Sequence, residues 1–234
     1  MKVMKKGALV VATLTLTVSL SACGNQGEDT KSTSSKEKNE PTITDILNSD
    51  KERMIIMTED TGNTESPQVR WAGIIGKGKL EAHPYVNKDD LAFDDLNNLT
   101  MKEFKDTLKQ QDKDYEEYGD NKKLNIVPRK ASTVLETEND EKAKKISFDM
   151  DSKGLGNKQD VGTILDTKYS KITDSSKNGW LSMQTKDAED ISGQPITPYV
   201  LNIKAGKNEE KLSFENVKKA EKEYDNVKVV KSND

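Results

Sequence analysis

Cys23 carries the clearest predicted chemistry in this sequence and is the only cysteine among its 234 residues. Lysines near the start of the chain precede an apolar run from Ala8 to Leu20. A basic start, an apolar stretch and small residues at the end are typical of a secretory signal peptide. The segment Leu20-Ser21-Ala22-Cys23 has the form of a lipobox, at which cleavage occurs before the cysteine. We therefore predict that the Cys23 thiol carries a diacylglycerol with acyl chains such as palmitate.

An uncleaved anchor helix and an incidental cysteine are the alternatives to this interpretation. The stretch over residues 7–22 has only 16 residues, and serine or threonine interrupts it at five positions. A spanning helix needs about 20 predominantly apolar residues. A lone thiol in a secreted chain has no intramolecular partner and is reactive. Both alternatives are therefore less favoured than lipidation.

A second set of side chains has nearly the spacing of a calcium-binding loop. Positions 1, 3, 5, 6, 9 and 12 of an EF-hand-like loop are occupied by Asp149, Asp151, Lys153, Gly154, Asn157 and Asp160. The lysine places a positive charge at a ligand position, and the last position lacks the usual bidentate glutamate. The preceding residues 145–148 also have the pattern of a strand instead of a helix. We therefore expect a polar loop without a metal, and calcium binding is the less favoured alternative.

The remaining candidates for catalysis are one histidine and scattered carboxylates. His83 is the sole histidine, which excludes a metal site with two histidine ligands within one chain. It lies before a proline at the end of a predicted strand, where we expect an exposed or structural side chain. The carboxylates include Asp89, Asp90, Asp94 and Asp95, and no spacing selects one pair for acid and base roles. The sequence therefore predicts no catalytic residue, no cofactor and no enzymatic activity.

Charge argues against two classes of partner. Cleavage before Cys23 removes three of the 37 basic residues and none of the 41 acidic ones, which leaves a net charge of −7. Nucleic-acid binding requires clustered lysine and arginine on one face, so no nucleic-acid partner is expected. No polybasic segment is available to hold anionic lipid headgroups. The lipid on Cys23 is therefore the predicted contact with the membrane.

The elements that must position these residues begin after a polar segment. Residues 24–40 contain no aliphatic or aromatic side chain, and such a segment cannot bury enough surface to offset its chain entropy. We predict a signal peptide over 1–22, a lipidated start and disordered tether over 23–40, and one globular domain over 41–234.

Local signals within the globular domain predict helices and short strands. Thr100 and Glu103 form a capping box, and Leu99 and Phe104 form a hydrophobic staple, at the start of an amphipathic helix predicted over about 101–118. A C-terminal helix is predicted over about 214–224. Strands are predicted over 53–58, 68–75, 79–85, 124–127, 132–138, 145–150, 162–167, 179–185, 199–205 and 227–230. The expected fold is α+β, with a mostly antiparallel sheet or sandwich.

Two strand features add detail to this expectation. The strand over 53–58 is apolar at consecutive positions, which predicts burial of both of its faces. Gly76-Lys77-Gly78 separates the next two strands and predicts a β-hairpin, because glycine supplies the positive φ that a tight turn needs.

Several of these segments together resemble a known class of proteins. The lipobox, the polar tether, the Asp45–Asp50 segment and the Leu96–Glu117 segment are similar to small surface lipoproteins of Gram-positive, low-GC bacteria. The resemblance implies a lipid-anchored location on the extracellular face of the cell membrane. The class has no assigned reaction or ligand, so only the role of Cys23 transfers to this chain.

The expected function is therefore a non-catalytic binding or interaction role at the cell surface, with an unknown protein or cell-wall partner. An exclusion or immunity lipoprotein that blocks a phage or plasmid is an alternative. A substrate-binding component of a transporter is less favoured, because about 212 residues are few for two α/β lobes.

Overall fold

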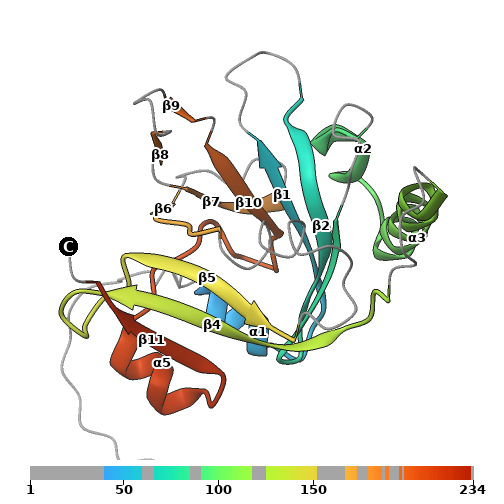
Figure 1. Cartoon of the computed structure of the whole chain (residues 1–234). Coiled ribbons are helices and arrows are strands. Elements are labelled where there is room, and N and C mark those ends of the chain that lie inside the picture. The colour runs from blue at the N-terminus through green and yellow to red at the C-terminus, as the bar shows by residue number, and fades with distance from the viewer. Residues whose placement is uncertain are drawn as a thin grey trace, which may run out of the picture. The chain divides into compact units, whose positions relative to one another are not determined.

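A curled, mostly antiparallel sheet is the centre of the computed structural model (Figure 1). Its strands are β1 (Arg53–Glu59), β2 (Gln68–Gly76), β3 (Lys79–Pro84), β4 (Arg129–Thr137), β5 (Lys145–Met150), β6 (Lys171–Ile172), β7 (Trp180–Gln184), β10 (Tyr199–Lys204) and β11 (Val227–Lys231). The order across the sheet is β11-β4-β3-β2-β1-β10-β7-β6, and β5 pairs with β4 outside this path. The pairing of β11 with β4 is parallel, and the other pairings between described strands are antiparallel.

Four described helices and a small second sheet complete the elements. The helices are α1 (Ile43–Asn48), α2 (Phe93–Leu96), α3 (Met101–Glu117) and α5 (Val217–Glu223). The strands β8 (Ala188–Glu189) and β9 (Pro195–Ile196) pair with each other. These elements confirm the predicted α+β class and the mostly antiparallel sheet.

The structure describes residues 40–59, 66–84, 91–117, 125–151, 167–172, 179–185, 188–189, 195–196 and 198–232. All of them belong to one unit that spans Glu37–Asp234. The predicted signal peptide, Cys23 and the predicted tether up to residue 39 lie outside the described residues. Within the part of the chain that is described, no helix is both long enough and apolar enough to cross a membrane.

Strand β1 is buried on both faces, as its consecutive apolar residues predicted. Successive side chains of a strand point to opposite faces of the sheet. Met54 and Ile56 therefore pack in one cluster with Phe104 and Leu108 of α3. Their neighbours Ile55 and Met57 pack in the other cluster, which contains the apolar residues of α1 and α5. The sheet consequently separates two cores.

The larger core contains an unusual polar contact at a methionine. The sulfur of Met57 lies 3.1 Å from Nε1 of Trp71 and 2.9 Å from the hydroxyl of Tyr169. All three side chains are almost completely buried. Burial also raises the pKa of Tyr169, so its hydroxyl stays protonated and donates to the sulfur. The thioether, a weak acceptor, thereby satisfies two donors that burial would otherwise leave without water.

The predicted hairpin joins β2 to β3. Its turn places Lys77 at φ 57° and Gly78 at φ 66°, and both values lie in the left-handed region. Two consecutive left-handed residues are the pattern of a type I′ turn, whose backbone twist matches that of the two paired strands. The glycines at this turn are therefore explained by the backbone geometry of the hairpin.

The sequence was wrong about residues 125–127, the described part of the predicted 124–127 strand. Residues 125–128 are irregular, and β4 begins at Arg129. Pro128 has no N–H to donate and restricts the residue before it, which opposes a strand that continues through this point. The predicted strand over 162–167 lies outside the described residues except for Thr167, which is not in a strand.

The C-terminal helix begins later than predicted. Asn216 is the N-cap of α5 and accepts a hydrogen bond from the backbone N–H of Lys219. The preceding residues are used in contacts between distant segments instead. The carboxylate of the buried Glu215 accepts a 2.8 Å hydrogen bond from the backbone N–H of Thr44, at the start of α1. The Ser213 N–H donates to the carbonyl of Pro41 at 3.0 Å. The carbonyl of Glu215 also accepts a 3.1 Å bond from the N–H of Ala143, so Ser213 and Glu215 are both bonded to distant segments.

Candidate functional site

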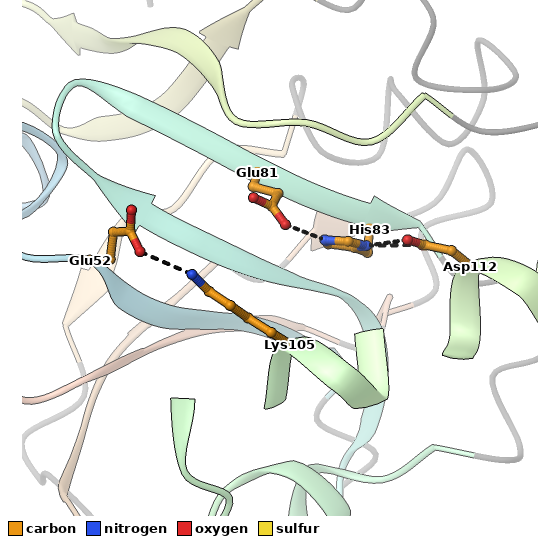
Figure 2. A network of polar contacts seen from close by, with 5 residues as sticks. All are labelled: Glu52, Glu81, His83, Lys105 and Asp112. Carbon is orange, nitrogen blue, oxygen red and sulfur yellow. Dashed lines mark hydrogen bonds and ion pairs between the residues drawn. The ribbon is translucent and has the colours of Figure 1, made fainter. Parts of the chain in front are cut away.

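His83, on β3, is the centre of a three-residue polar array that joins the sheet to α3 (Figure 2). Its Nδ1 lies 2.9 Å from both carboxylate oxygens of Asp112, which is on α3. Its Nε2 lies 3.1 Å from Oε1 of Glu81, on the same strand. The His83 side chain is only 3 % exposed. We call Glu81, His83 and Asp112 the histidine array.

The secondary structure explains how these residues meet. Glu81 and His83 are two residues apart on a strand, so their side chains share one face. Lys105 lies about two helical turns before Asp112 and therefore faces the same side of α3. Its Nζ is 3.1 Å from Oε2 of Glu52, just before β1. Figure 2 shows both connections, by which α3 is tied to the sheet at two points along its length.

Electrostatics favour a protonated imidazole in this array. Burial alone lowers the pKa of His83, but the hydrogen bonds and charges of Asp112 and Glu81 outweigh it, so the pKa is raised above its ordinary value. The protonated ring donates one N–H to each carboxylate. At the second connection, hydrogen bonds from Lys105 and then Lys77 lower the pKa of Glu52.

This geometry limits the chemistry that His83 can perform. A general base needs a ring nitrogen within hydrogen-bonding reach of the proton that it removes. Both nitrogens of His83 face carboxylates, and the ring is buried. The arrangement acts as an ion-paired clamp between β3 and α3. Of the two expectations for His83, the structural role agrees with the structure, and the exposed side chain is wrong.

We expect the His83→Gln variant to lose about 2 kcal/mol of unfolding free energy at about pH 5.5, and less at about pH 8.5. Because the folded-state pKa is raised, the stabilisation is fully present below the unfolded-state pKa, near pH 6.5. It is lost as the pH rises through the folded-state value. Urea unfolding of wild type and variant across this range measures the difference.

Lys105→Gln is the matched control, because it breaks the more exposed connection between α3 and the sheet. An exposed ion pair contributes about 0.2–1 kcal/mol, and this variant leaves the imidazole of His83 and its two carboxylate partners in place. A loss in His83→Gln that is the same at both pH values would contradict the clamp.

The 149–160 segment, predicted as a polar loop with calcium binding as the less favoured alternative, is only partly described, and its described acids have basic partners. Asp149 lies in β5 and pairs with Lys228 of β11. Asp151 follows β5, and its Oδ2 is 3.8 Å from Nη1 of Arg129. Lys153, Gly154, Asn157 and Asp160 lie outside the described residues. Among the residues that are described, no group of three or more histidine, cysteine, aspartate or glutamate side chains is arranged to hold a metal ion.

The other predicted acids have local structural contacts where they are described. Asp95 accepts a 2.8 Å hydrogen bond from the backbone N–H of Ala92, at the start of α2. Asp94 accepts a 2.7 Å bond from the amide of Asn97. Both contacts belong to the first turn of a helix, where acids are favourable. Asp89 and Asp90 lie outside the described residues, as does Cys23.

Sequence reasoning missed the two carboxylates of the histidine array. The spacing of Glu81 and His83 on a predicted strand was a usable signal, because it places both side chains on one face. Asp112 is 29 residues from His83, and no local pattern connects them. Comparisons of the chain with family models, with curated proteins and with solved structures found no match.

Proposed function

We propose that this protein is a lipoprotein anchored on the extracellular face of the cell membrane, with a non-catalytic binding role. The observation that carries the proposal is the Leu20-Ser21-Ala22-Cys23 segment, which follows a basic start and an apolar run. That pattern is a linear recognition signal for lipidation. It is independent of how the rest of the chain folds.

The histidine array supports a role that needs no catalysis. The one histidine is buried with both nitrogens facing carboxylates, so it stabilises the contact between β3 and α3. A binding role requires only a stable surface. The sheet, buried on both faces at β1, supplies a rigid support for such a surface.

Cell fractionation tests the proposed location. In bacterial cells that express the full chain, we expect the protein in the membrane fraction, resistant to high-salt washing and released by detergent. Protease added to intact cells is expected to degrade it, because the folded part lies outside the membrane. A cytoplasmic protein expressed in the same cells serves as the protected control. Recovery of the protein in the soluble fraction, or its protection in intact cells, would overturn the proposal.

A further inference from the structure

A cleft of about 860 Å³ lies where three distant segments of the chain meet. The segments are the turn between β4 and β5, the residues around β6, and the residues before α5. The lining includes Lys142, Lys144, Lys145, Lys171, Glu138 and Phe214. Small-molecule sites in proteins typically have volumes of about 300–1,000 Å³. We call this feature the lysine cleft.

Backbone hydrogen bonds hold the walls of the lysine cleft together. The N–H of Ala143 donates to the carbonyl of Glu215 at 3.1 Å, and the N–H of Val217 donates to the carbonyl of Glu141 at 3.0 Å. On the other side, Ile146 and Tyr169 exchange two backbone bonds of 3.0 Å. These bonds between distant segments fix the backbone framework of the cleft.

Positive charge exceeds negative charge in the lining. Lys144 pairs with Glu138. Lys145 shares Glu136 with Lys168, at 3.1 Å and 2.7 Å respectively. Hydrogen bonding to Lys168 lowers the pKa of Glu136, which keeps this shared carboxylate ionised.

Two lysines of the cleft, Lys142 and Lys171, have no acidic partner among the residues that the structure describes. Lys142 places its Nζ 5.5 Å from the centre of the Phe214 ring, a cation–π contact that orients the ammonium group. In the described portion of the chain, no carboxylate forms an ion pair with Lys142 or Lys171. The chain as a whole has a formal net charge of −4, so this positive excess is a local property.

We propose that the lysine cleft binds a ligand through its phosphate groups. This inference rests on the proposed binding function and assigns the ligand class. Lysine ammonium groups are point charges on flexible stems, and they suit a tetrahedral, multiply charged phosphate. A planar carboxylate is matched better by the fork of an arginine, and the lining contains no arginine among its described residues.

Calorimetric titration of the full-length protein in non-ionic detergent with inorganic tripolyphosphate tests the proposal. Wild type is expected to bind it saturably in about 0.15 M salt. The Lys142→Gln/Lys171→Gln variant is expected to bind at least about tenfold more weakly. The matched control is Lys109→Gln/Lys113→Gln, which removes the same charge from exposed positions on α3. Its affinity is expected to stay within about twofold of wild type.

Three results would overturn the proposal. They are no saturable binding by wild type, an equal loss of affinity in both double variants, and equally tight binding of a tricarboxylate. Both double variants change exposed side chains, and matching melting temperatures would show that each still folds. The titration does not depend on lipidation. If this protein is acylated and exposed at the cell surface but does not bind tripolyphosphate, only the phosphate-binding proposal is refuted. If it binds tripolyphosphate but is found in the cytoplasm, only the proposed location is refuted.

Discussion

Replacement of Cys23 by alanine is expected to abolish fatty-acid labelling of the protein completely. The variant is also expected to lose its attachment to the membrane through the lipid. The thiol is the only cysteine sulfur in the chain, so no second residue can accept the diacylglycerol. Metabolic labelling with a radioactive or clickable fatty acid, followed by immunoprecipitation, measures the loss. The variant is expected either in the medium or as an uncut precursor.

The size of this effect follows from the way that lipids anchor proteins. A single acyl chain gives only marginal membrane binding, whereas two chains hold a protein stably. The predicted mature chain has a net charge of −7, so electrostatic attraction to anionic lipids does not compensate for a lost diacylglycerol. Ser32→Ala is a suitable control in the same N-terminal segment, and it should retain full labelling. Equal labelling of wild type and Cys23→Ala would refute the lipidation prediction.

Replacement of Gly73 by alanine is expected to destabilise the fold by more than about 4 kcal/mol, which prevents folding or lowers the melting temperature by roughly 10 °C or more. Gly73 is in β2, between Ile55 of β1 and Ala82 of β3. A Cβ added to it would lie 1.8 Å from the backbone oxygen of Glu81 and 3.1 Å from Cα of Ala82. These are backbone atoms of a paired strand, so they cannot move aside without disturbing the hydrogen-bond ladder.

Gly179→Ala is the matched control for this prediction. Gly179 has a φ of +78°, and its nearest neighbour to an added Cβ is the flexible end of Lys204 at 4.0 Å. Alanine there should incur only the left-handed backbone strain of about 1–2 kcal/mol. Thermal unfolding followed by circular dichroism compares the two variants. A loss of stability in Gly73→Ala as small as that in Gly179→Ala would show that β2 and β3 separate easily at this position.

The helix cap and the hairpin turn that local signals predicted are present in the structure. Thr100 and Glu103 form the two capping hydrogen bonds expected at the start of α3, at 2.9 Å and 3.3 Å. The turn at Lys77 and Gly78 has the left-handed backbone that its composition indicated. Such signals are reliable because the interacting groups are only a few residues apart, so spacing alone sets their geometry.

The start of the C-terminal helix was predicted wrongly, in a segment whose structure depends on residues far away in the sequence. The predicted C-terminal helix was extended to residue 214, but long-range bonds from Ser213 to Pro41 and from Thr44 to Glu215 hold this segment in another conformation. The local pattern of apolar residues favoured a helix that begins at residue 214. Contacts with residues about 170 positions away outweighed that preference.

The sequence by itself determined the features that are linear: the pattern around Cys23 that predicts a lipobox, the polar segment after it, the net charge, and the capped or turn-marked starts of elements. Only the tertiary structure decided which distant side chains meet. It brought Asp112 to His83, and it brought Lys171 and Phe214 to the turn between β4 and β5. The physical reason is that spacing along a chain constrains neighbours within a turn of helix or a hairpin. The pairing of β1 with β10, about 145 residues apart, depends instead on burial of the whole sheet.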